Sequence, residues 1–311
     1  MKKIKTKHGI IFNPLTKIFK LFKKKPKIYN LNEEETHDQG IIISNHSAAS
    51  GPLTLSIYYP TFFVPWGTYE MTEKYTVRWK YLYHVFYTQK LGYNKFKSFI
   101  LATLFGVISK MLYNGMQLIP TYPNLNFKHT IKLSINHLKK GNSILVFPED
   151  SNTGYHEKLI KYNNGFVYLS EKYFKETKID LPIYPVYYHK VLGSMIIGKK
   201  VYINDLKDKG LNRTEIADYF KDITNELAHE LFKLERKRPI FKEEKVFKLR
   251  LINKLKNISG NYIELSVNDF DFLNNKETYL TYQEIMKKVM TKKDEIINEF
   301  KGRLKIRYYR R

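Results

Sequence analysis

The sequence predicts an α/β fold in which a mixed β-sheet is flanked by helices. Two observations support this prediction. Residues 41–44 and 144–147 form short apolar runs rich in β-branched side chains, which is typical of buried strands. Segments with apolar residues at helical spacing, such as 127–138 and 216–234, alternate with these runs along the chain. Strands that alternate with helices form sheets with helices packed on their faces.

Each element of this fold is predicted from its local pattern. In chain order we expect a strand at 41–44, a helix at 52–59, a helix at 127–138 that ends before Gly141, strands at 144–147 and 181–188, one or two strands within 195–203, and a helix at 216–234. The apolar stretch 99–112 contains Ser109 and Lys110 and is too short to span a membrane, so we expect a buried or interfacial helix there. Polar runs follow two strands, at 44–47 and 149–152, where ligands of α/β sheets usually bind.

Composition sets the broad class of the protein. The chain has 311 residues, of which 43% are hydrophobic and 27% are charged, so a folded protein is expected rather than a disordered one. Cysteine is absent, which excludes disulfides, a cysteine nucleophile and thiolate metal sites. The N-terminus lacks a continuous apolar block and a small-residue cleavage site, so we expect no secretory signal.

Charge is concentrated at the two ends of the chain. Lysine and arginine number 54 against 30 acidic residues, a formal net charge of +24. Residues 1–27 contain ten lysines and no acid, and residues 236–311 contribute another +10, which leaves about +4 for residues 28–235. We therefore expect a basic segment at 1–27, an α/β domain at 28–235, and a basic extension at 236–311 that includes a helix beginning at Thr281.

The N-terminal segment contains a short amphipathic helix at 14–25. Its apolar residues recur at helical spacing, while most of its lysines fall elsewhere on the helix; the apolar residues are Leu15, Ile18, Phe19 and Phe22. Two interpretations remain open. The helix lies in the interface of an anionic membrane, or its apolar stripe packs on the protein's own core.

Three blocks of sequence resemble a known family. Asn45-His46-Ser47-Ala48-Ala49-Ser50-Gly51-Pro52, Phe147-Pro148-Glu149-Asp150-Ser151-Asn152 and Pro182-Ile183-Tyr184-Pro185-Val186 resemble, in order and spacing, three of the four blocks of the glycerolipid acyltransferases, the 1-acylglycerol-3-phosphate acyltransferase family. Softer matches occur at 105–120 and 162–166, and the resemblance covers about residues 38–205.

This resemblance implies a glycerolipid acyltransferase-like core and transfer of a fatty acyl group from a thioester to a glycerolipid hydroxyl. The donor would be acyl-CoA or an acyl carrier protein, the acceptor a lysophospholipid, and no cofactor or metal would be needed. His46 matches the family's catalytic base, a role that suits an imidazole because it is largely neutral near pH 7. Glu149 matches the family's glutamate.

The chain departs from the family pattern at several positions. Gly51 stands where the family has the aspartate that orients the histidine, and Asn152 replaces an arginine that binds the acceptor phosphate. Thr121 and Tyr122 stand where the second block ends in arginine. Two hypotheses follow. Either Asp150, at a family glycine, has taken the orienting role, or the protein keeps the fold and lipid affinity without efficient catalysis. Under the first hypothesis, restoring the family pattern with Gly51→Asp in an Asp150→Asn background should recover part of the activity. Asp150 could also simply cap a turn.

The remaining nominated residues are candidates for binding substrate, namely Asn45, Ser47, Ser50, Ser151, Asn152 and Lys128. For Ser47, Ser50 and Lys128 the alternative is structural, because loop serines usually serve the loop and lysines are usually solvated. A nucleic-acid-binding protein is the rival class for a chain this basic. The basic excess lies outside the motif-bearing core, however, and favours a peripheral protein on the cytoplasmic face of an anionic membrane.

Overall fold

The computed structural model describes residues 5–7, 12–33, 38–47, 50–150, 158–236, 262–265 and 306–309. The chain divides into two compact units, Met1–Lys237 and Arg238–Arg311. In the second unit, β9 (Tyr262–Leu265) pairs antiparallel with β10 (Ile306–Tyr309). The helix predicted to begin at Thr281 lies outside the described residues.

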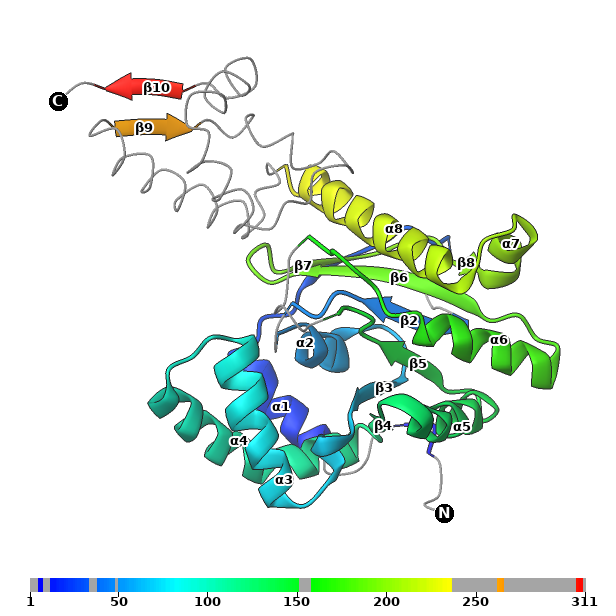
Figure 1. Ribbon diagram of the computed structural model, residues 1–311, viewed down its shortest axis with the longest axis horizontal. Coiled ribbons are helices and arrows are strands. Elements are labelled where there is room, and N and C mark those ends of the chain that lie inside the picture. The colour runs from blue at the N-terminus through cyan, green and yellow to red at the C-terminus, as the bar shows by residue number, and fades with distance from the viewer. Residues whose placement is uncertain are drawn as a thin grey trace. The chain divides into compact units, whose positions relative to one another are not determined.

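One mixed sheet organises the first unit (Figure 1). The strand order is β1-β7-β6-β2-β5-β3-β4, and β8 also pairs with β6. The strands are β1 (Lys27–Asn30), β2 (Ile41–Ser44), β3 (Phe63–Thr68), β4 (Ile119–Thr121), β5 (Ser143–Val146), β6 (Pro182–His189), β7 (Ser194–Ile197) and β8 (Val201–Tyr202). The strands from β6 to β4 in this order run parallel, whereas β7 and β8 run antiparallel to β6. The predicted fold class is confirmed.

Helices cover both faces of the sheet. They are α1 (Phe12–Phe22), α2 (Ser50–Tyr58), α3 (Tyr75–Lys80), α4 (Lys95–Gly115), α5 (Phe127–Leu138), α6 (Gly165–Thr177), α7 (Ile203–Asp208) and α8 (Arg213–Leu234), with η1 (Tyr69–Thr72) and η3 (Asn124–Asn126) as 3₁₀ turns and η2 (Tyr81–Lys90) as a π-helix. Side chains of α5, α6, α7 and α8 pack in one core cluster, and α2 packs in another (Figure 1).

The central strand β2 shows why its sequence forms a buried strand. Ile41 and Ile43 point into the core cluster beneath α5, α6 and α8, whereas Ile42 points into the cluster that contains Leu55 of α2. Successive side chains of a strand alternate between the two faces, so a strand covered on both faces needs apolar residues throughout. Such a run lacks the alternation of apolar and polar residues that marks a half-buried strand, but its length and β-branched residues identify it as a strand.

Helix α8 has both a start signal and a buried stripe. Asn212 accepts hydrogen bonds from the backbone of Thr214 and Glu215, at 2.9 and 3.1 Å, and Glu215 accepts one from the backbone N–H of Asn212 at 2.7 Å. This reciprocal pair satisfies N–H groups that the first helical turn leaves without intrahelical partners. Ile216 and Phe220 lie on the buried side, as the apolar spacing predicts.

Most predicted elements are found, with shifted ends. The helix predicted at 14–25 is α1 and runs from Phe12 to Phe22, and the one predicted at 52–59 is α2. The stretch 99–112 lies inside α4, which has 21 residues. Among the described residues, α4 is long and apolar enough to cross a membrane by length and composition. The helix is longer than the predicted stretch because it extends at both ends, through Lys95, Lys97 and Gly115. The expectation that it is a buried or interfacial helix and does not span a membrane stays a prediction.

Removing a core ring should destabilise the first unit. Phe220 is fully buried and contacts Phe166 edge-on, with ring centroids 5.5 Å apart. We expect Phe220→Ala to lower the free energy of unfolding by roughly 3–5 kcal/mol, because it leaves a cavity between α8 and α6. Tyr219→Ala, at the exposed neighbouring position, is the matched control and should cost far less. Equal urea midpoints for the two variants would contradict this assignment of the core.

Candidate active site

The first and third sequence blocks meet at the carboxyl edge of the sheet. Strands β2 and β5 are parallel neighbours, with Ile41 opposite Ile144 and Ile43 opposite Val146. The same register, continued past the strand ends, places His46 opposite Glu149. The structure shows that contact directly, because the backbone N–H of His46 donates a hydrogen bond to the Glu149 carboxylate.

The imidazole of His46 is half-buried beside an aromatic ring. Its centroid lies 4.9 Å from that of Phe147, with the two rings tilted by 56°. Phe147 comes from the loop after β5, the same loop that carries Glu149. The residues Phe147 and Glu149 therefore hold the ring and the backbone of the predicted base from one side.

Asn45 fixes the other side of the histidine. Its side chain is buried and bridges to β6, donating to the Tyr188 carbonyl at 2.9 Å and accepting from the Tyr188 N–H at 2.7 Å. Both the NH₂ group and the oxygen of the Asn45 amide thus bond to the backbone of β6. The structure accounts for Asn45 as a brace that joins the end of β2 to β6.

Glu149 is tied to the segment that precedes α6. Residues 149 and 162 form an isolated β-bridge, and Asn163 donates to the Pro148 carbonyl at 2.7 Å. The ring of Tyr162 is buried, and burial together with the nearby Glu149 carboxylate raises the pKa of its hydroxyl well above the ordinary value. This segment closes over the loop after β5 and holds Glu149 in place.

Asp150 lies among lysines. Its backbone N–H donates to the Lys161 carbonyl at 3.1 Å, and its carboxylate is 3.8 Å from the Lys161 ammonium. Burial lowers the pKa of Lys90, while the carboxylates of Glu70 and Asp150 raise it. The Asp150 carboxylate therefore interacts with two lysines, Lys90 of η2 and Lys161 of the segment before α6. Its predicted role toward His46 stays a prediction.

The loop after His46 turns sharply into α2. Ser47 has a positive φ of 44°, and its carbonyl accepts from the N–H of Ser50 at 3.2 Å. The buried Ser50 hydroxyl accepts from the Lys23 ammonium at 2.5 Å and lies 3.4 Å from the Tyr188 hydroxyl. Lys23 also donates to the Thr54 hydroxyl at 3.1 Å. Ser50 thus serves as the point where α1, α2 and β6 meet.

Lys23, which directly follows the C-terminal end of α1, is not among the residues nominated from the sequence. Burial, together with the positive charge of Lys190, lowers the pKa of Lys23. Among ten lysines in residues 1–27, nothing in the sequence marks this one, since its position depends on how α1 packs. Lys23 brings a half-buried cation to the start of α2, close to the histidine loop.

The structure gives a steric reason for glycine at position 51. A β-carbon on Gly51 would press against the carbonyl group of His46, with the carbonyl carbon 2.9 Å away and the Asn45 oxygen at 3.2 Å. These are backbone atoms, which cannot swing aside as a flexible side chain can. Gly51→Asp must therefore displace the His46 backbone before its carboxylate can act. The expected recovery of activity by Gly51→Asp in an Asp150→Asn background stays a prediction.

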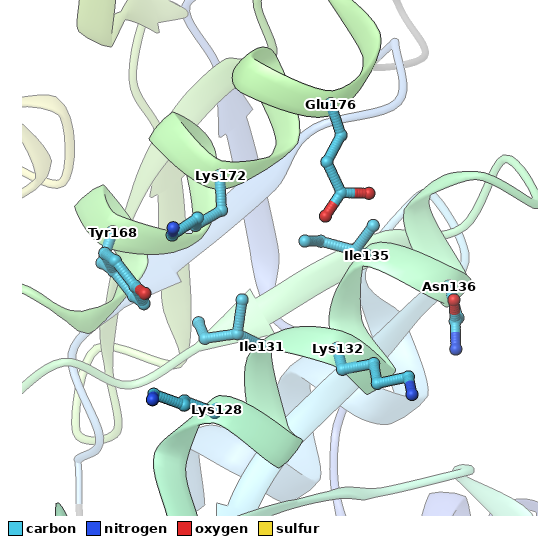
Figure 2. A pocket seen from close by; sticks show the side chains of 8 residues that line it. All are labelled: Lys128, Ile131, Lys132, Ile135, Asn136, Tyr168, Lys172 and Glu176. Atoms are coloured by element: carbon cyan, nitrogen blue, oxygen red, sulfur yellow. The ribbon is translucent and has the colours of Figure 1, made fainter. Parts of the chain in front are cut away.

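The other nominated residues lie elsewhere. Lys128 lines an open groove of about 450 Å³ between α5 and α6, together with Lys132, Lys172 and Glu176 (Figure 2). None of the described residues of the first and third blocks lines this groove. Ser151 and Asn152 fall outside the described residues. Within the described part of the chain, no group of three or more His, Asp or Glu side chains is arranged to hold a metal ion.

Comparison with solved structures finds similarity to an acyltransferase. The crystal structure of the 1-acyl-sn-glycerophosphate (LPA) acyltransferase PlsC from Thermotoga maritima matches with a TM-score of 0.43 and 13% sequence identity, over 74% of this chain and 81% of that chain. No protein-family model and no curated protein matches the chain. We therefore base a functional assignment on the residues of the site.

Filling the space at Gly51 should disturb the histidine loop. We expect Gly51→Asp to lower the free energy of unfolding by roughly 1–3 kcal/mol, because the new side chain must displace the His46 backbone. Gly51→Ala, which adds only the β-carbon, should produce part of the same loss. Urea unfolding measures both. Wild-type stability of Gly51→Asp would contradict the close approach of α2 to His46.

Proposed function

We propose that the protein is an O-acyltransferase that moves a fatty acyl group from a thioester donor to the hydroxyl of a glycerolipid, with a lysophospholipid as acceptor. The observation that carries this proposal is the contact between the first and third blocks, in which His46 donates its backbone N–H to the Glu149 carboxylate. The two motifs that resemble the glycerolipid acyltransferases are 103 residues apart in sequence and meet at one edge of the sheet.

In the proposed reaction, His46 is the general base. Its imidazole takes the proton of the acceptor hydroxyl while the hydroxyl oxygen attacks the thioester carbonyl carbon. The carbon–sulfur bond then breaks, the new ester forms, and the thiolate leaves with the proton returned by the imidazolium. The half-buried setting beside Phe147 keeps part of the imidazole accessible, as this role requires. Either acyl-CoA or an acyl carrier protein would supply the thioester, and no cofactor enters the reaction.

Glu149 and Asp150 take different parts in this proposal. Glu149 holds the histidine loop by accepting the His46 N–H. Asp150 follows it directly and would orient the imidazole in place of the carboxylate missing at position 51. Ser47, Ser151, Asn152 and Lys128 are the remaining candidates for contacts with the acceptor or donor.

The competing function is a lipid-binding protein that has lost efficient catalysis. It is favoured by Gly51, where the backbone leaves no room for the family's carboxylate. Both functions place the protein on the cytoplasmic face of an anionic membrane, and they differ in whether product forms. A nucleic-acid-binding function remains the third candidate because of the basic ends.

Replacing the base should abolish most turnover. We expect His46→Ala to lower acyl transfer from a radiolabelled acyl thioester to lysophospholipid by roughly 10²–10⁴-fold, the usual contribution of a general base. His84→Ala, an exposed histidine of η2, is the matched control and should retain wild-type activity. Vesicle binding by wild type without any His46-dependent product would favour the lipid-binding protein instead.

The proposed role of Asp150 has its own test. We expect Asp150→Asn to lower turnover by about a hundredfold or more with little loss of stability, because an amide cannot stabilise the imidazolium. Lys161→Gln is the control, since it removes the ion pair and leaves the carboxylate. If both variants lower turnover equally, or if Asp150→Asn is as active as wild type, the orienting role is wrong.

A further inference from the structure

Helix α4 has its large apolar residues on the outside. Its buried positions carry small side chains, among them Ser98, Ala102, Gly106 and Ser109. Its exposed positions carry large apolar ones in a single stripe, namely Phe96, Ile100, Leu104, Val107 and Met111. This stripe, together with Phe99 beside it, is the α4 apolar face. A helix of a water-soluble surface shows the opposite arrangement, with large apolar residues inward and polar ones outward.

The inward side of α4 is fixed by close contacts. A β-carbon on Gly106 would lie 3.0 Å from the ring of Tyr75, so α3 approaches the helix at its small residues. Arg78 is 3% exposed and donates to the Ser109 hydroxyl at 3.2 Å and to the Gly106 carbonyl at 3.1 Å. Small residues permit this close packing, and turning the helix would leave a buried guanidinium without these partners. The apolar face is therefore held outward.

Helix α1, which packs on α4, also exposes apolar residues. Phe12 and Phe19 pack against Leu112, Met116 and Phe105, so α1 is docked on the C-terminal half of α4 (Figure 1). With these rings facing α4, α1 exposes two large apolar residues, Ile18 at 52% and Leu21 at 82%. The two helices thus present apolar side chains from segments about 80 residues apart in the chain.

Lysines border this apolar surface, and acids are absent from it. On α4, Lys97 and Lys110 are exposed on the two sides of the apolar stripe, and Lys95 stands at its start. On α1 and the turn after it, the exposed cations are Lys17, Lys20, Lys24 and Lys25. Neither α1 nor α4 contains an aspartate or glutamate. The rim therefore matches anionic phosphate headgroups in charge.

We propose that the α4 apolar face inserts into one leaflet of a membrane that carries anionic lipids. Exposed apolar patches of this kind mark surfaces that are covered in use. The lysines favour an anionic membrane as the partner, because they would lie at the level of the phosphate headgroups while the apolar face contacts the acyl chains. Since the inward side of α4 is packed on α3, the helix lies in the leaflet rather than crossing it. The inference is independent of the proposed chemistry, because binding to lipid requires no acyl transfer.

Flotation with vesicles of phosphatidylcholine, with and without phosphatidylglycerol, tests this proposal on the full-length protein. Leu104→Asp and Val107→Asp should each weaken binding to the anionic vesicles by about tenfold or more, because each removes an exposed aliphatic side chain that the leaflet would bury and adds a repelled charge. Ile179→Asp, at an exposed apolar position after α6, is the matched control and should bind as wild type. Added salt should weaken binding to the anionic vesicles most.

The absence of cysteine allows a second measurement that needs no charged substitution. Val107→Cys, labelled with an environment-sensitive fluorophore, should shift to the blue when anionic vesicles are added, whereas labelled Ile179→Cys should not. Wild-type vesicle binding by Leu104→Asp, or no shift at position 107, would overturn the proposal. So would a wild-type dimer that Leu104→Asp converts to a monomer, because a second copy would then cover the face.

Discussion

The parallel pairing of β2 with β5 on one side and β6 on the other is the constraint on which the candidate site depends. A single register holds through the paired strands and through the first residues beyond them, so the loop with His46 faces the loop with Glu149. The same strand end is fastened to β6 through Asn45 and the backbone of Tyr188. The histidine is positioned by the strand register and by the side chains of Glu149 and Asn45, which fasten its backbone and the end of β2.

Gly51 then limits what the site can contain. Helix α2 begins so close to His46 that a β-carbon on residue 51 has no room. Backbone packing therefore accounts for the glycine at the position where the family has an aspartate. Glu149 cannot serve fully in its place, because its carboxylate already accepts the His46 backbone N–H. Asp150 is the neighbouring acid that remains as a candidate for the orienting role, and its carboxylate lies near Lys161 and Lys90.

Much of this could be predicted from the sequence, for identifiable reasons. Runs such as 41–44 and 144–147 are apolar throughout because their strands are buried on both faces, and length with β-branching is enough to find them. The strand β3 was missed because proline and glycine interrupt it at Pro65 and Gly67, and the edge strand β1 because it follows a run of lysines. The order of the motifs predicts that the loops of His46 and Glu149 lie at the same edge of the sheet. The clash between a side chain at position 51 and the His46 backbone depends on backbone positions that the sequence does not give.

The same limit explains α4 and Lys23. The apolar stretch 99–112 predicts a helix, yet composition does not say which side faces the protein, and here the small residues do. Lys23 connects the end of α1 to α2. It ends the helix that carries Ile18 and Leu21, its ammonium binds Ser50 and Thr54 of α2, and its carbonyl accepts the Tyr58 hydroxyl at 2.5 Å.

Helix α1 therefore touches both the proposed lipid surface and the first turn of α2, which packs on the His46 backbone. The chemistry proposed for His46 and the lipid surface proposed for α4 are thus joined by one short helix.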